Sequence, residues 1–156
     1  MAGRRTPRAL CLCCAVLALA AGAASVTWAA EYRSVADAGA ILYDAPSVKA
    51  RKLYVVGAGY PVEIAVTVEG WTKVRDASGE LNWVESRLLS ERRTVLVRTG
   101  VADARESPND TAPLVFRAEQ NVVLDPIEPA ADGWLRVRHR DGQTGYIRTS
   151  QLWGVQ

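Results

Sequence analysis

The stretch at residues 132–147, DGWLRVRHRDGQTGYI, has a close counterpart at residues 69–84, EGWTKVRDASGELNWV. Equivalent positions lie 63 residues apart, as Trp71 and Trp134 do near the start of each stretch. The same spacing holds at the turn glycine and at the final aliphatic residue. A constant spacing over hydrophobic and turn positions together indicates that the chain contains a duplicated unit.

The repeat extends beyond these two stretches. Leu89 and Leu152 keep the spacing of 63 residues, whereas the segments between drift by a few positions. Constant spacing in strands with drift in loops is typical of a duplicated domain. We therefore expect two small domains, at 31–92 and 95–156, joined around the sequence SERRTVLV.

Each copy has the pattern of β structure. Short runs rich in β-branched and aromatic residues are bounded by Gly, Pro or Asp, as in KLYVV, PVEIAVTV, WTKV and LNWV of the first copy. The segments DASG and RDGQ predict tight hairpin turns, because glycine adopts the positive φ that such turns require. A copy of roughly 60 residues can bury a core only if its sheet curls into a barrel. The expected fold class is therefore all-β, with two small barrels.

The first 29 residues have the features of a secretory signal peptide. Arg4, Arg5 and Arg8 precede a long uncharged, apolar run, and small residues lead to a cleavage position after Ala29. The run is also about long enough to span a bilayer, so an uncleaved anchor is the alternative. Both topologies export the rest of the chain, because the arginines stay in the cytoplasm. The expected location is periplasmic or secreted, with no membrane span after cleavage.

Cysteine usage limits the chemistry of the exported part. Cys11, Cys13 and Cys14 all lie within the expected signal peptide. The mature chain would therefore have no disulfide, no thiol nucleophile and no thiolate metal site.

The charge of the exported part argues against nucleic acid as a partner. Removing the three leader arginines from the 19 Lys and Arg residues leaves 16, against 17 Asp and Glu, for a formal charge of −1. Proteins that bind nucleic acid rely on an excess of basic residues, which is absent here.

The second copy resembles the bacterial Src-homology-3-type (SH3-like) domain. GWLRVR followed by DGQTGYI and SQL matches that family's Gly-Trp strand, glycine turn and terminal leucine, and ADARESP resembles its opening segment. The first copy departs from the family pattern at Asn82, where glycine is preferred, and at Tyr43, where a small polar or basic residue is usual. The resemblance implies two tandem SH3-like barrels and a cell-envelope ligand.

The sequence offers little material for an enzyme. His139 is the one histidine, and no serine lies in a nucleophile motif. A catalytic triad or a metal site needs several convergent ligands. We therefore expect no enzymatic activity, no metal and no cofactor, and interpret His139 as an exposed strand residue beside a turn.

A basic stripe in the second copy is the first candidate for ligand binding. Strand alternation places Arg136, Arg138 and Arg140 on one face, with Arg148 nearby in the sequence. The stripe is either a cradle for carboxylates, which guanidinium groups bind in a bidentate manner, or a solvated hairpin face paired with Asp residues.

Aromatic residues are the second candidate. By resemblance to SH3 barrels, Trp71 and Trp134 border the ligand groove of their copies; the alternative is packing in the core or between the copies. Tyr43 would enlarge the groove of the first copy. We place the principal site in the second copy, with Trp134 and Arg136 at its centre.

These features together predict an exported, non-catalytic binding module. By the resemblance, the ligand is a cell-wall peptide, such as a peptidoglycan peptide, or an envelope protein. The alternative is a structural adaptor, in which the barrels only mediate protein–protein assembly in the periplasm.

Signal-peptide cleavage is directly testable. Protein recovered from the periplasm should have an intact mass that starts at Ala30 and lacks all three cysteines, because the peptidase removes the leader. Full-length chain embedded in the membrane would instead support the anchor.

Overall fold

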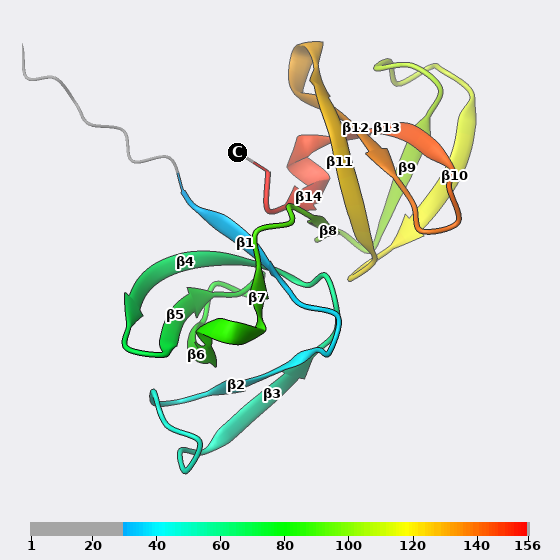
Figure 1. Ribbon diagram of the computed structural model, residues 1–156. Coiled ribbons are helices and arrows are strands. Elements are labelled where there is room, and N and C mark those ends of the chain that lie inside the picture. The colour runs from blue at the N-terminus through cyan, green and yellow to red at the C-terminus, as the bar shows by residue number, and fades with distance from the viewer. Residues whose placement is uncertain (1–29, 156) are drawn as a thin grey trace, which may run out of the picture.

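The computed structural model describes residues 30–155, and their regular structure consists of β-strands and three short 3-10 helices. The strands form two antiparallel sheets of seven strands each, one in each half of the chain (Figure 1). The predicted all-β fold is confirmed. The expected signal peptide lies outside the described residues.

The first sheet has the strand order β3-β2-β6-β5-β4-β1-β7. Its strands are β1 (Tyr32–Val35), β2 (Ala40–Tyr43), β3 (Lys52–Val56), β4 (Pro61–Val68), β5 (Trp71–Arg75), β6 (Leu81–Glu85) and β7 (Leu89–Ser90). A 3-10 helix, η1 (Ser86–Leu88), connects β6 to β7.

The second sheet has the order β10-β9-β13-β12-β11-β8-β14, which repeats the first sheet strand for strand. Its strands are β8 (Val95–Val97), β9 (Val101–Arg105), β10 (Leu114–Glu119), β11 (Val123–Ala130), β12 (Trp134–Arg138), β13 (Thr144–Arg148) and β14 (Leu152–Trp153), with 3-10 helices η2 (Ala131–Gly133) and η3 (Thr149–Gln151). The duplication read from the sequence is therefore a duplication of topology.

Each sheet encloses its own hydrophobic core. In β12, Leu135 and Val137 are buried and Arg136 between them is not, which is the alternation of a strand with one face inward. The same alternation in β5 buries Thr72 and Val74. Two separate clusters of buried aliphatic residues result, one in each copy.

The predicted glycine turns are confirmed. Gly79 and Gly142 have φ of +91° and +94°, a region that other residues rarely adopt. Each glycine donates its backbone N–H to the carbonyl three residues earlier, at 2.9 Å in both turns. These turns set the register of β5 on β6 and of β12 on β13.

The departure from the family pattern at Asn82 has a structural reason. Asn82 is buried, and its Nδ2 donates to Asp76 Oδ2 at 3.0 Å. Asp76 Oδ1 also accepts the backbone N–H groups of Ser78 and Glu80, at 2.9 and 3.1 Å. Asn82 therefore stabilises the β5–β6 turn of the first copy through its hydrogen bond to Asp76.

The second copy has Gly145 at the position of Asn82. A Cβ added there would lie 3.0 Å from Ala104 Cβ and 3.2 Å from the Arg105 carbonyl oxygen. Since real Cβ atoms rarely approach so closely, β13 and β9 pack together only because this residue is glycine. The copies thus share a topology but differ in how this strand is held.

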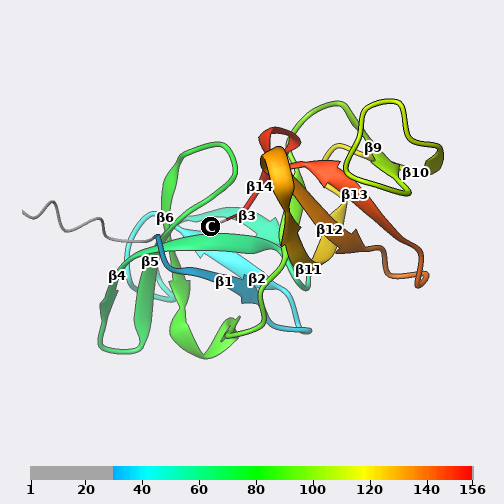
Figure 2. The same ribbon diagram turned by 90° about the horizontal axis from the view of Figure 1, so that it is seen from above.

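A short connection joins the two copies, and the copies also contact each other (Figures 1 and 2). Thr94, which is buried, donates from Oγ1 to the Gly59 carbonyl at 2.6 Å. The rings of Tyr32 and Trp153, from the first and last strands, meet edge to face with centroids 5.6 Å apart. The barrels are therefore held together at a packed seam rather than by the connection alone.

The buried Asn82–Asp76 hydrogen bond predicts a measurable loss of stability. Asn82→Ala should lower the free energy of unfolding by about 1–3 kcal/mol, because a buried carboxylate oxygen loses its donor. Chemical denaturation measures this difference. In an Asp76→Ala background the same substitution should have much less effect, and an equally large loss there would contradict the pairing.

Candidate functional site

The candidate site is a groove on the second copy, of about 750 Å³. It lies between β9, β10 and the loop that joins them on one side, and the start of β12 and η3 on the other. We call it the copy-two groove; its lining residues are Val101, Asp103, Arg105, Asp110, Arg117, Trp134, Arg148, Ser150 and Gln151.

Trp134 and Arg148 form the centre of the copy-two groove. They are cross-strand neighbours on β12 and β13, and the guanidinium carbon of Arg148 lies 4.4 Å from the centroid of the Trp134 ring. Trp134 itself is only 3% exposed. A guanidinium stacked on an indole combines cation–π attraction with a planar array of donors, so this pair presents charge above an aromatic floor.

The orientation of Arg148 is fixed by other groups. Its Nε and Nη2 donate to the two carboxylate oxygens of Asp110, and Nη1 donates to the Asp132 carbonyl at 3.2 Å. Hydrogen bonding from Arg148 lowers the pKa of Asp110, and the same bond raises the pKa of Arg148. Both groups are charged at neutral pH, so the loop carrying Asp110 is tied to the groove electrostatically.

A second charged cluster lies on the opposite wall. Asp103 accepts from Arg105 Nη2 at 3.1 Å and from Arg117 Nε at 3.0 Å. Arg105 also donates to the Ala112 carbonyl at 2.8 Å. The lining thus contains three guanidinium groups and two carboxylates, which leaves it net positive. Such a groove favours a ligand with a negative charge.

The equivalent surface of the first copy is aromatic instead. Tyr43 and Trp71 meet edge to face, with centroids 5.4 Å apart. By strand pairing, Tyr43 corresponds to Arg105 of the second copy, since each lies opposite the aromatic residue of β6 or β13. Glu85 takes the place of Arg148 opposite the tryptophan and pairs with Arg87. The first copy therefore lacks the positive charge of the copy-two groove.

Comparison with protein families matches the bacterial SH3 domain twice, over residues 36–91 and 100–154. The two matches cover more than half of the chain, one in each sheet, and leave β1 and β8 outside. The chain belongs to the bacterial SH3 domain family. Bacterial SH3 domains are commonly binding modules and recognise proteins or peptides.

Two solved structures from Trichomonas vaginalis are similar to the tandem SH3 chain. They are NlpC2, at 18% identity with 80% of this chain covered, and NlpC1, at 22% identity with 83% covered; both have a TM-score of 0.36. The chain spans about half the length of either protein, at 48%. A search of curated proteins finds no match.

Two further findings concern residues 30–155. No helix in this part of the chain is long and apolar enough to cross a membrane. Nor do His, Cys, Asp and Glu residues gather there in threes as a metal ion would require.

Of the residues singled out from the sequence of the second SH3 copy, the structure brings Trp134 and Arg148 together in the groove. Arg136 lies outside its lining: it donates to Glu128 on β11 at 3.1 Å, and its guanidinium is 5.9 Å from the Tyr146 ring. Arg138, two residues further along β12, is exposed and lies opposite Asp125. Both occupy the outward face of β12 beside the groove.

The sequence reasoning missed the acidic and basic residues of the opposite wall. Asp103 and Arg105 alternate with buried Ala102 and Ala104 along β9, so a period of two was present in the segment ADARESP. Asp110 lies in a loop, where no such period exists. Its role depends on the fold bringing it to Arg148, 38 residues away.

His139 follows the end of β12 and is partly buried, so it is not the exposed strand residue expected from the sequence. Its Nδ1 lies 3.0 Å from Asp141 Oδ1, and its ring lies 5.7 Å from that of Phe116. Asp141 also accepts the backbone N–H of Gln143 at 3.0 Å and Gln143 Nε2 at 2.8 Å. These contacts organise the β12–β13 turn.

Asp141 should make that turn sensitive to acid. Hydrogen bonds, first from the backbone N–H of Gln143 and then from His139, lower the pKa of Asp141 from 3.8 to about 2. The pKa of Asp141 is lower in the folded protein than in the unfolded chain. The hydrogen bonds therefore stabilise the fold fully above pH 3.8, and this stabilisation is lost as the pH falls through about 2.

Asp141→Asn should therefore lower the unfolding midpoint at neutral pH, with a difference from wild type that shrinks as the pH approaches 2. Denaturation curves at a series of pH values measure this. Glu69→Gln, an exposed carboxylate in another turn, should leave the midpoint nearly unchanged throughout. A difference independent of pH would contradict the assignment.

Proposed function

We propose that the protein is an exported, non-catalytic binding module whose copy-two groove binds a carboxylate-bearing peptide of the cell envelope, with peptidoglycan peptides as the ligand. The observation that supports this proposal is the Arg148–Trp134 stack, flanked by Arg105 and Arg117 on the opposite wall. Family membership supports a binding role in general; the ligand follows from the chemistry of the groove.

The groove has unused donors for such a ligand. Arg105 and Arg117 share the single carboxylate of Asp103, and each guanidinium has five N–H donors. A peptide carboxylate would bind to the remaining donors, in a bidentate manner where geometry permits. Because Asp103 and Asp110 already hold the arginines in place, little side-chain entropy is lost on binding.

Apolar contact would come from Val101, at the start of β9. Wall peptides combine carboxylates with small apolar side chains. Val101, which is about half exposed, lines the groove together with the charged groups, so both parts of such a peptide have a matching surface. An extended peptide lying across Val101 would therefore place its carboxylate near the arginines.

Arg136 and Arg138 extend this surface in the proposal. They continue the outward face of β12 from Trp134, and Arg136 already has Glu128 as a partner. A longer ligand would reach them after crossing the groove. Their contribution is expected to be smaller than that of the arginines that line the groove.

The first copy has an orienting role in this proposal. Its Tyr43–Trp71 pair has the Glu85–Arg87 ion pair nearby, which adds no net positive charge to attract a carboxylate. The packed seam between the copies would hold the copy-two groove in a fixed direction relative to the rest of the molecule. Tyr43 and Trp71 would offer apolar contact to the same ligand or to a neighbouring strand of wall.

Co-sedimentation with purified sacculi tests the proposal. The wild-type protein should sediment with sacculi, and Arg117→Gln or Arg148→Gln should weaken binding about tenfold, as expected for the loss of a charged hydrogen bond. Arg117 is the cleaner probe, because its one ion-pair partner among the described residues is Asp103. Arg136→Gln and Arg138→Gln serve as matched variants on the adjacent face and should have smaller effects.

Each variant needs an unchanged unfolding midpoint before its binding is interpreted. If folded Arg117→Gln and Arg148→Gln proteins sediment like wild type, the groove is not the site. A larger loss in the Arg136 and Arg138 variants would move the site to the face of β12. Recovery with envelope proteins, and none with sacculi, would support the structural adaptor instead.

A further inference from the structure

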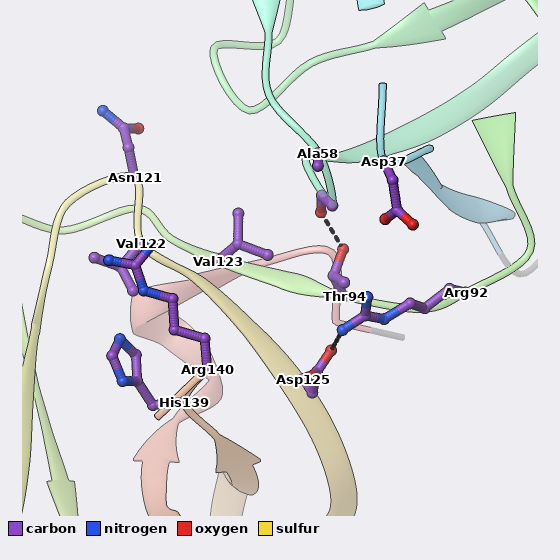
Figure 3. A pocket seen from close by; sticks show the side chains of 11 residues that line it. Asp37, Ala58, Arg92, Thr94, Asn121, Val122, Val123, Asp125, His139 and Arg140 are labelled. Atoms are coloured by element: carbon purple, nitrogen blue, oxygen red, sulfur yellow. Dashed lines mark hydrogen bonds and ion pairs between the residues drawn. The ribbon is translucent and has the colours of Figure 1, made fainter. Parts of the chain in front are cut away.

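A second concave site lies between the two copies, away from the copy-two groove. It is a cleft of about 450 Å³, within the size range of small-molecule sites. Residues of the first copy (Asp37, Ala58, Gly59), the connection (Arg92, Thr94) and the second copy (Asn121, Val122, Val123, Asp125, His139, Arg140) line it (Figure 3).

The walls of the inter-copy cleft are fastened to each other. The Thr94–Gly59 hydrogen bond joins the connection to the first copy, and Arg92 Nη2 forms an ion pair with Asp125 Oδ1 at 2.6 Å (Figure 3). A Cβ added at Gly59 would lie 3.4 Å from Val123 Cγ1, so the two copies are in close contact there. The cleft is therefore a feature of the assembled pair of domains, not a gap between independent ones.

The remaining charges lie at opposite ends of the cleft. Figure 3 shows Asp37 on the side of Ala58, and Arg140 on the far side beside Val122. Among residues 30–155, no hydrogen bond or ion pair of either side chain is found, whereas Arg92 and His139 have Asp125 and Asp141 as partners. One exposed carboxylate and one exposed guanidinium, with no protein partner among these residues, thus line the same cleft.

The floor between these charges is small and partly apolar. Val123 points into the cleft in Figure 3, with Thr94 beside it. A ligand that only carried a negative charge would use Arg140 and leave Asp37 unmatched. A cation would do the reverse. A ligand with both charges, separated by a short apolar part, satisfies both ends at once.

We infer that the inter-copy cleft binds a small zwitterion, such as an amino acid or a short peptide with free ends. Its carboxylate binds Arg140, its ammonium group binds Asp37, and its apolar part lies on Val123. The site is independent of the copy-two groove and does not rest on the function proposed for it. Because its lining comes from both copies, occupancy would also stabilise their contact.

Binding of the dipeptide Ala-Ala to the mature two-domain protein tests this inference. Amide NMR signals of Gly59, Thr94, Asn121 and Val123 should shift on titration with millimolar Ala-Ala. N-acetyl-Ala-Ala lacks the ammonium group and Ala-Ala amide lacks the carboxylate, so each should bind about tenfold more weakly.

The variants make the assignment of each end specific. Asp37→Asn should weaken the binding of Ala-Ala about tenfold and leave the binding of N-acetyl-Ala-Ala unchanged. Arg140→Gln should weaken the binding of Ala-Ala about tenfold and leave the binding of Ala-Ala amide unchanged. Lys49→Gln, in the β2–β3 loop far from the cleft, is the matched control and should bind as wild type.

Three results would overturn the inference. They are no shift in the cleft signals at millimolar peptide, equal binding of the capped and free peptides, and shifts confined to Trp134 and Arg148. Loss of sacculus binding in the groove variants bears on the copy-two groove alone, so failures of the two proposals are distinguishable.

Discussion

The structure depends on strict alternation along the central hairpin of each copy. In β12 and β13, Leu135, Val137 and Ile147 are buried in the core. Since adjacent residues point to opposite faces, burying these side chains forces Trp134 and Arg136 onto the other face. The chemistry of the outer surface is thus fixed by the core, because a shift of one residue in β12 would expose Leu135 and Val137 and bury the arginines.

Fold and repeat were readable from the sequence because both depend on local pattern. The glycine turns and the β-branched runs of the long strands carry enough periodic signal, whereas β7 and β14 are two residues each and hold none. The site was readable only in part. That Trp134 stacks with Arg148 rather than with Arg136 depends on cross-strand register, and Asp110 reaches the groove from a loop with no pattern.

Duplication preserved the frame and let the surfaces diverge. Valine, leucine and alanine fill both cores, but the residue opposite the tryptophan is Glu85 in one copy and Arg148 in the other. One exchange of this kind inverts the charge beside an aromatic floor at little cost to the core, because the side chain lies on the outer face. The exchange of Asn82 for Gly145 is different, since it alters how the interior itself is packed.

The edge-to-face contact of Tyr32 with Trp153 has a consequence for the length of the array. By strand pairing Val35 is equivalent to Val97, so the second copy has Thr94 where the first has Tyr32, and the first has Ser90 where the second has Trp153. Thr94 is moreover buried. The second copy therefore lacks an aromatic ring at the position of Tyr32, and the first copy lacks one at the position of Trp153. Stacking through this contact is self-limiting, and it closes at a pair.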